Sequence, residues 1–267
     1  MDSPHVNLRI ATWNINSLRL RLPLLKELIA ALEPDVICLQ ETKVPDELFP
    51  AEGPAQLGFP HVLFRGMKGY NGVAILSRLA LSDVTNGMPA FADDQKRLIA
   101  ASVGAGAEAL RVVCVYVPNG QAVGTEKYEY KLKWLSACRS WLGIEMGRTT
   151  QIAVLGDYNV APEDADVHDP KAWEGQVLCS APEREAFRSL LALGLKDAFR
   201  LFSQGEKSFT WWDYRMNAFR RNLGLRIDHV LLGSELASRC RGCNIDVEPR
   251  RAERPSDHAP IIVELDP

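Results

Sequence analysis

The sequence predicts an α/β protein in which helices cover the outer faces of buried β-sheets. Two observations lead to this fold class. Short apolar runs rich in β-branched residues recur along the chain, which is typical of buried strands. Segments with apolar residues at helical spacing lie between some of these runs. Strands that alternate with helices indicate sheets in the interior and helices on the outside.

Eight apolar runs predict the strands of these sheets. Each run is short and is bounded by Gly, Pro, Asn or Asp, which favours a strand over a helix segment. The eight runs are Leu8–Trp13, Val36–Leu39, Val73–Leu76, Leu98–Val103, Val112–Val117, Ile152–Leu155, Val230–Leu232 and Ile261–Leu265.

Three segments predict helices. The first has apolar residues at helical spacing over 25–32, with Pro23 suited to its first turn. The second, over 125–143, shows the same spacing. The third begins at Ser180, because Glu183 stands where the second half of a capping box is expected.

Composition and charge place the chain among ordinary globular proteins, with 46% hydrophobic and 24% charged residues. No linker, low-complexity tract or fixed-period repeat interrupts it, so we expect a single domain over 1–267. The 31 Lys and Arg against 34 Asp and Glu give a formal net charge of -3. This balance argues against a protein that holds nucleic acid by bulk positive charge, but a local basic groove stays compatible with it.

The sequence also bears on the compartment. No apolar run approaches the roughly 18 residues that span a bilayer, and the start of the chain lacks the pattern of a secretory signal. Six cysteines are too few for a disulfide scaffold in 267 residues, and Cys38 and Cys114 lie inside predicted strands. We therefore expect a cytoplasmic protein that does not associate with membranes.

The unusual polar residues stand where predicted strands run into loops, which is where α/β proteins gather catalytic groups. Carboxylates and amide oxygens without a cysteine pair suit Mg²⁺ or Mn²⁺ rather than Zn²⁺. A histidine held by an aspartate can bind a phosphoryl oxygen or transfer protons. If they converge, these residues indicate metal-assisted hydrolysis of a phosphoester. They are the acids Glu41, Asp157, Asp228 and Asp257, together with Asn14, Tyr116, Asn159 and His258.

Each of these residues also has a simpler explanation when taken alone. Glu41 could be a solvated residue after a strand, and Asp157 with Asn159 could form an Asx turn. Tyr116 could be a core aromatic whose hydroxyl bonds a carbonyl. The isolated pair of cysteines in Cys240-Arg-Gly-Cys243 lacks the second pair that a zinc site needs, so we expect no zinc there.

Six motifs, in their order along the chain, resemble a known family: TWNIN, LQETK, VYVPNG, GDYNVAP, RIDHVLL and SDHAPI. They match the exonuclease III class of abasic-site endonucleases, which shares its fold with deoxyribonuclease I in the endonuclease/exonuclease/phosphatase superfamily. The match runs from about Leu8 to Leu265 and departs at Ser17, where the class often has Gly. The resemblance implies a four-layered α/β sandwich, with two mixed sheets face to face and one cleft at the sheet edges.

The resemblance implies a Mg²⁺ site, in which Mn²⁺ could substitute, and a water nucleophile. Glu41 would be the central metal ligand, with Asp257 contributing and Asn14 supporting the cluster. Asp157 would orient or deprotonate the attacking water, and Asn159 would help to place it.

The remaining matched residues would contact the phosphate. Tyr116 and His258 would bind the scissile phosphate, Asp228 would fix the imidazole of His258, and Asn119 would add a further contact. At Ser17 we expect a modest change of loop geometry rather than lost activity.

The stretch 209–226 carries four Arg against one Asp, interleaved with aromatic residues, which suits a nucleic-acid groove. A core loop with solvated arginines is the simpler alternative. In the family, the positions of Trp211, Leu225 and Ile227 line an apolar pocket for a flipped-out baseless sugar. The resemblance also implies that Arg215 falls in a loop that would reach into a DNA groove.

The sequence thus predicts a monomeric, Mg²⁺-dependent nuclease that acts on double-stranded DNA with abasic sites or blocked 3′ ends. It would cut 5′ to the abasic site and leave a 3′-hydroxyl, with 3′-to-5′ exonuclease and 3′-end-trimming activity. One alternative is a phosphatase of the same superfamily acting on inositol phosphates or lipids, against which LQETK and the basic-aromatic stretch argue. The other is an inactive nucleic-acid-binding module, against which the full set of catalytic residues argues.

Overall fold

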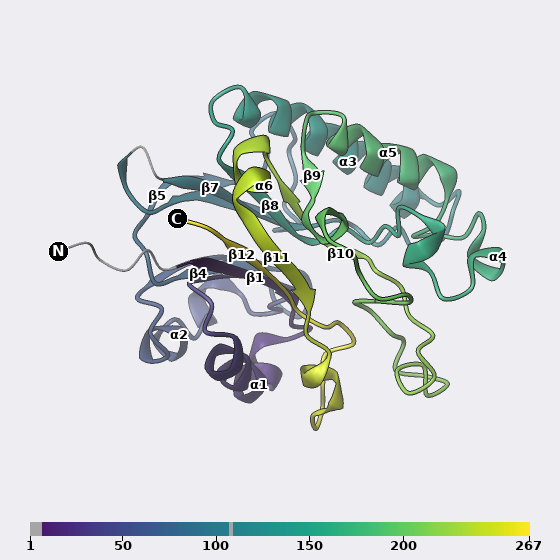
Figure 1. Ribbon diagram of the computed structural model, residues 1–267, viewed down its shortest axis with the longest axis horizontal. Coiled ribbons are helices and arrows are strands. Elements are labelled where there is room, and N and C mark those ends of the chain that lie inside the picture. The colour runs from purple at the N-terminus through teal and green to yellow at the C-terminus, as the bar shows by residue number, and fades with distance from the viewer. Residues whose placement is uncertain (1–6, 107–108) are drawn as a thin grey trace.

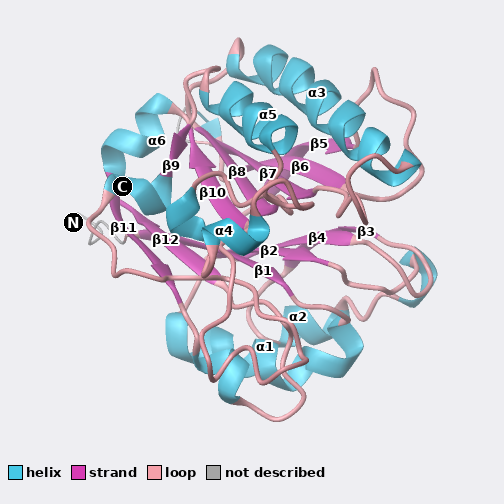
Figure 2. Ribbon diagram, turned by 90° about the vertical axis from the view of Figure 1, so that its right-hand side faces the viewer, coloured by secondary structure: helices cyan, strands magenta, loops and turns pink. Residues whose placement is uncertain are grey.

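Two six-stranded mixed sheets pack face to face in the computed structural model, which describes residues 7–106 and 109–267 (Figure 1). Helices cover the outer face of each sheet, so the chain forms four layers (Figure 2). The predicted fold class, an α/β sandwich of two mixed sheets with helices outside, is confirmed.

The first sheet joins both ends of the described chain. Its parallel pair is β1 with β2, and its other neighbours are antiparallel. The strand order is β11 (Cys240–Ile245), β12 (Ile261–Leu265), β1 (Leu8–Asn14), β2 (Val36–Gln40), β4 (Val73–Ser77) and β3 (His61–Arg65).

The second sheet repeats this plan with strands from the middle of the chain. Its parallel pair is β7 with β8, and β10 runs antiparallel to β8. The strand order is β5 (Leu81–Asn86), β6 (Leu98–Val103), β7 (Leu110–Tyr116), β8 (Ile152–Asp157), β10 (Asp228–Leu232) and β9 (Lys196–Asp197).

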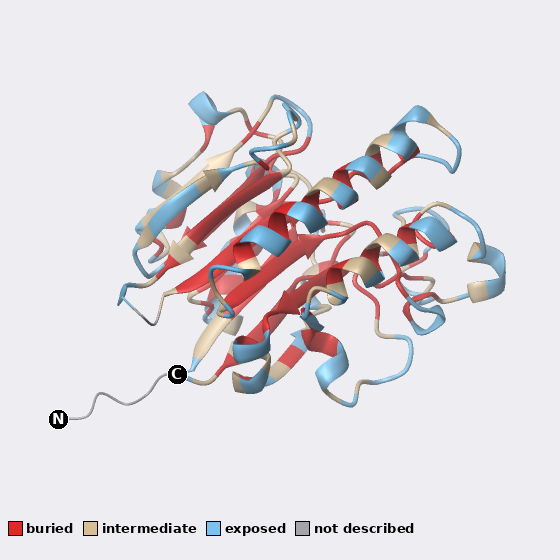
Figure 3. Cartoon of the chain, turned by 90° about the horizontal axis from the view of Figure 1, so that it is seen from above, coloured by how far each residue is buried: buried red, intermediate tan, exposed pale blue. Residues whose placement is uncertain are grey.

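The helices bury one side on the sheets and expose the other (Figure 3). Helices α1 (Leu18–Leu32) and α2 (Glu52–Gln56) lie against the first sheet, and α3 (Glu126–Met146) and α5 (Ala181–Leu191) against the second. Two short helices, α4 (Pro170–Trp173) and α6 (Ser234–Arg239), lie in connections. Among the described residues, no helix has the length and apolar character to cross a membrane.

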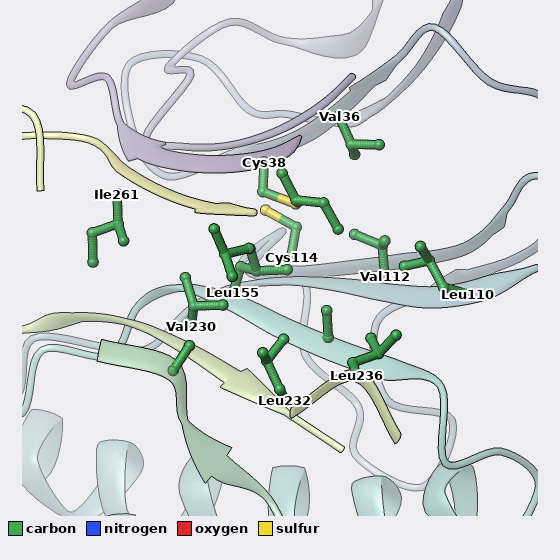
Figure 4. Close-up of a cluster of buried hydrophobic side chains, with 14 of the residues drawn as sticks. Val36, Cys38, Leu110, Val112, Cys114, Leu155, Val230, Leu232, Leu236 and Ile261 are labelled. Atoms are coloured by element: carbon green, nitrogen blue, oxygen red, sulfur yellow. The ribbon is translucent and has the colours of Figure 1, made fainter. Parts of the chain in front are cut away.

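The core between the sheets is apolar and carries no disulfide bond. Cys38 from β2 and Cys114 from β7 lie among aliphatic side chains of both sheets (Figure 4). All six cysteines are free and buried, including Cys240 and Cys243, so this pair forms no disulfide.

All eight predicted strands are present, and four further strands were missed. The missed strands are β3, β5, β9 and β11, which are the four edges of the two sheets. An edge strand is covered on fewer sides and can carry polar residues, so it leaves no apolar run in the sequence. The burial of β5, where most residues are exposed, illustrates this.

The predicted start of the first helix was wrong. Helix α1 begins at Leu18, so Pro23 lies inside it rather than in its first turn. The helix starts earlier because the backbone N–H groups of Ser17 and Leu18 donate to the carbonyls of Glu41 and Thr42, at 2.7 and 3.0 Å. The predicted helix at 125–143 and the capping box at Ser180 are confirmed.

A buried group of charges fixes the start of β10. The guanidinium of Arg226 donates to Asp166 Oδ1 at 2.7 Å and Asp197 Oδ2 at 2.8 Å, and it contacts His229 Nδ1 at 3.0 Å. His229 Nε2 lies 2.8 Å from the carbonyl of Val160. Since Arg226 can only donate, Nδ1 of His229 accepts and Nε2 donates, which is the neutral imidazole.

Burial and the Arg226 charge lower the pKa of His229 to about 3. Because an exposed imidazole titrates near 6.5, the unfolded chain takes up this proton first. The stabilising contribution of neutral His229 is therefore complete above about pH 6.5 and is lost as the pH falls toward 3.

We expect the free energy of unfolding of the wild type to fall by roughly 1.5 kcal/mol relative to His229→Gln between pH 6.5 and 5. Urea unfolding of both proteins at several pH values measures this difference. The comparison between the two proteins removes contributions that they share, such as the titration of carboxylates. Parallel pH curves for the two proteins would contradict a neutral His229.

Candidate active site

The polar residues that follow the predicted strands meet at one edge of the two sheets. Tyr116 and Asp157 end the parallel strands β7 and β8 and are register partners. Asp228 begins the antiparallel strand β10 and is also paired with Asp157. Asn14 ends β1 in the other sheet and is paired with Gln40, the last residue of the parallel strand β2, so Glu41 directly follows its register partner.

Asn14 joins the two sheets. Its buried side-chain amide donates to Glu41 Oε1 and to Asp157 Oδ2, both at 2.9 Å. A single amide nitrogen thus uses both of its hydrogens to hold two carboxylates that come from different sheets.

Glu41 is held ionised by a neighbouring cation. Lys43 Nζ lies 2.8 Å from Glu41 Oε2 and donates to Asn16 Oδ1 at 2.7 Å. Burial raises the pKa of Glu41, but Lys43 and Asn14 outweigh burial and leave the pKa lowered. Glu41, Lys43 and Asn16 all have positive φ angles, between 46° and 54°, which non-glycine residues seldom adopt and which cluster at functional sites.

His258 stands between two buried aspartates. Its Nδ1 lies 2.8 Å from Asp228 Oδ2, and its Nε2 lies 3.8 Å from Asp157 Oδ2. Burial lowers the pKa of His258, but Asp228 and Asp157 outweigh burial and raise the pKa to about 10. At neutral pH His258 is therefore an imidazolium with a proton on each ring nitrogen, so it donates hydrogen bonds rather than binding a metal.

Asp157 has an unusual proton affinity. Burial and the nearby Asp228 raise its pKa, against the lowering effect of His258, to about 7. Its Oδ1 accepts from the backbone N–H of Asn159 at 2.8 Å, which fixes the carboxylate. Asn119 donates from Nδ2 to Asn159 Oδ1 at 3.1 Å, so this polar group continues to the loop after β7.

Tyr116 adds a neutral donor. Burial raises the pKa of its hydroxyl, and the carboxylates of Glu41 and Asp157 raise it further. The guanidinium of Arg97 lies 4.7 Å from the centre of its ring, within the range of a cation–π contact. The hydroxyl therefore keeps its proton and can donate it in a hydrogen bond.

A divalent cation fits this donor set. Ligand atoms of Glu41, Asp157 and His258 all lie within 4.8 Å of one another. Because His258 is protonated, the carboxylate oxygens are the available ligands, and Asn14 supports them through its amide nitrogen while its amide oxygen accepts from the backbone N–H of Asn16 at 3.1 Å. Oxygen-only ligands suit Mg²⁺ or Mn²⁺.

Asp257 lies beside this group and contacts Asn16 and Trp211. Its Oδ1 accepts from Asn16 Nδ2 at 2.8 Å, and its Oδ2 accepts from Trp211 Nε1 at 3.0 Å. Burial raises the pKa of Asp257, but His258, Asn16 and Trp211 outweigh burial and leave the pKa lowered. Its assignment to the metal site stays a prediction, since it is not in the group formed by Glu41 and its neighbours.

Sequence reasoning missed the roles of Asn16 and Lys43. Asn16 contacts both Lys43 and Asp257 and so links the two acidic parts of the site. Both residues stand inside quoted motifs, WNIN and LQETK, but only the acids and the first asparagine of these motifs were given roles.

The predicted substrate residues differ in exposure. Trp211 is half-buried and forms isolated bridges with Leu225 and His258. Leu225 and Ile227 are buried in an apolar cluster behind it. The side chain of Arg215 is 89% exposed, on a loop that leaves the sandwich.

Ser17 adopts the backbone of the glycine that it replaces in the family pattern. Its φ of 90° lies in the region that favours glycine, and its side chain makes no capping hydrogen bond. The loop nevertheless keeps its hydrogen bond to the Glu41 carbonyl.

Comparison with known proteins identifies relatives along almost the whole chain. Exodeoxyribonuclease III of Haemophilus influenzae is 38% identical and is aligned over 97% of this chain and 100% of its own length. The chain is also similar to a solved structure from Neisseria, a 3′ phosphatase bound to a product DNA hairpin. That structure has a TM-score of 0.93 and 43% identity, and the match covers 97% of this chain and 99% of that one.

A third similarity is to an AP endonuclease from Archaeoglobus fulgidus, with a TM-score of 0.91 and 38% identity. The match covers 97% of this chain and 100% of that one. The resemblance seen in the sequence motifs is thus confirmed. The model of the endonuclease/exonuclease/phosphatase family matches residues 11–258, and the chain belongs to this family.

Proposed function

We propose that the chain is a divalent-metal-dependent DNA repair nuclease. It hydrolyses the phosphodiester 5′ to abasic sites in double-stranded DNA, leaves a 3′-hydroxyl, and also acts as a 3′-to-5′ exonuclease and trims blocked 3′ ends. The observation that carries this proposal is the meeting of Glu41, Asp157 and the His258–Asp228 pair across two sheets. The printed names of the relatives, which include an exodeoxyribonuclease, a 3′ phosphatase and an AP endonuclease, support the same reaction class.

Asp157 is the group that takes a proton from the attacking water. Its pKa of about 7 leaves a substantial ionised fraction at neutral pH and still makes it a useful base. The backbone of Asn159 fixes one carboxylate oxygen, and the other lies toward His258. Asn159 and Asn119 present amide groups beside this carboxylate and help to orient the water and the phosphate.

His258 and Tyr116 stabilise the charge that develops on the phosphoryl oxygens. The imidazolium is kept in place by Asp228, so its Nε2 proton is held on the side of Asp157 without reorganisation. Glu41, with Asn14 and Asp257 beside it, would hold Mg²⁺ or Mn²⁺, which when bound supplies Lewis-acid stabilisation of the departing oxygen.

The walls of the cleft suit a DNA lesion. Trp211, which is half-buried and packs against the buried Leu225 and Ile227, offers an apolar surface for a sugar without its base. Extrusion costs least where no base is stacked. Arg215 is exposed, with Asp213 Oδ1 3.6 Å from its Nε, and can contact a phosphate or a groove. The family resemblance leads us to expect a monomer. The six free cysteines support a reducing, cytoplasmic compartment.

The first test of this function compares three substrates with Mg²⁺ and with EDTA. We expect incision of a duplex with one abasic site and removal of a 3′-phosphate from a nicked duplex, both abolished by EDTA. Denaturing gels measure both reactions. Hydrolysis of an inositol phosphate without action on either DNA would instead support the superfamily phosphatase.

Asp157→Asn should lower kcat for incision by roughly 10³-fold, because loss of a positioned base costs about 10²–10⁴ in rate. The dissociation constant for the duplex should change little, since asparagine keeps the shape of the side chain. Asp164→Asn is the matched control, because Asp164 is an exposed acid with a side chain that is 73% exposed. Wild-type kcat in Asp157→Asn would remove this residue from the mechanism.

Arg215→Ala should weaken duplex binding about tenfold and reduce the slope of log K against log salt by about 1, as expected for one lost phosphate contact. Fluorescence anisotropy at several salt concentrations measures both values. Arg188→Ala on the outer helix α5 is the control, because its side chain is also exposed, at 55%. An equal effect of both variants would show that Arg215 contributes only bulk charge.

A further inference from the structure

A buried lysine lies beneath the loops that follow β7 and β8. Lys131 is fully buried on α3, although its side chain ends in a charge. Its Nζ donates to the backbone carbonyls of Asn119 at 3.1 Å and Asn159 at 2.6 Å, and to the carboxylate of Glu183. An ammonium has three hydrogens, and each of them has an acceptor here.

Glu183 is equally buried and is fixed by its own partners. It is the capping-box residue of α5 and accepts from the backbone N–H groups of Leu178 at 3.0 Å and Ser180 at 3.1 Å. In the Lys131–Glu183 pair, Glu183 is therefore fixed at the start of α5, and Lys131 extends from α3 to the loops of the active site. An ion pair used only for packing would not need to end on the carbonyls of two site loops.

The two carbonyls belong to residues whose side chains form part of the site. Asn119 and Asn159 bond each other, and the N–H of Asn159 holds Asp157. Asn159 has a φ of 50°, a conformation that needs support from its surroundings. Gly120, with a φ of 92°, brings the first loop against the lysine stem, where an added Cβ would lie 3.1 Å from Lys131 Cδ.

We propose that Lys131 is a positioning residue for the reaction. Its ammonium sets the distance between the loops of Asn119 and Asn159, and through Asn159 it sets the place of Asp157. Lys131 does not reach the substrate, so it governs the rate of the chemical step and not the affinity for DNA. This inference rests on the proposed nuclease function.

The test compares the effect of losing the two hydrogen bonds from Lys131 to the backbone carbonyls with the effect of losing its ion pair with Glu183. The double variant Lys131→Met/Glu183→Gln is electrically neutral and lacks the donors to both carbonyls. The single variant Glu183→Gln breaks the charge pair in the same way but keeps the lysine and its donors. Both are assayed on the abasic duplex and on the 3′-phosphate duplex, well below the midpoint of their thermal unfolding.

We expect kcat of the double variant to fall about 10- to 100-fold, the size of effect that misplaced groups produce, with less than a threefold change in the dissociation constant for DNA. Glu183→Gln should keep kcat within about threefold of the wild type. If both variants lose kcat equally, the lysine acts only through its ion pair and the proposal is wrong. Full kcat in the double variant would also overturn it.

Lys131→Arg gives a second test that does not depend on the folding of the double variant. Arginine keeps the charge for Glu183, but its larger planar head displaces the carbonyls, so kcat should fall about tenfold with DNA affinity unchanged. Wild-type kcat in this variant would contradict the proposal. A wild-type protein that acts on neither DNA substrate would refute the nuclease function itself, whatever the variants do.

Discussion

The site depends on how the negative charges of carboxylates from two different sheets are compensated. Glu41 belongs to one sheet, and Asp157 and Asp228 belong to the other, so packing the sheets brings like charges together. Asn14 offsets this by donating to Glu41 and Asp157 at once, and His258 offsets it by lying between the two aspartates. Removing either compensating group would leave buried carboxylates facing each other, which is strongly unfavourable.

The mixed topology explains how distant sequence motifs reach this place. Parallel strands β7 and β8 end at the same edge, and the antiparallel strand β10 begins there. In the other sheet, β12 runs antiparallel to β1, so the loop before β12 carries His258 to the end of β1. Trp13 fixes that loop, because its Nε1 donates to the His258 carbonyl at 3.0 Å.

Sequence patterns predicted the strands that are buried on both faces of their sheet. The eight predicted strands are the interior strands of the two sheets, whereas the edges were missed because β3 and β11 mix polar and apolar residues. For the site, the motifs supplied the groups that meet at the sheet edge. They could not supply Lys131, because a lysine on an outer helix is ordinarily solvated, and only the three-dimensional structure shows that this one points inward.

The charge states of the site explain why a cation and DNA should act together. The pKa of Glu41 and that of Asp257 are both lowered, so both carboxylates stay ionised at neutral pH. Lys43 compensates part of the Glu41 charge, but the ionised carboxylates together would still repel a phosphodiester, because Asp228 and Asp157 already use the charge of His258. A divalent cation held beside Glu41 would reduce this repulsion. A net charge of -3 is therefore compatible with DNA binding. Attraction for the phosphates is needed only at the cation-bound site and at the exposed arginines around it.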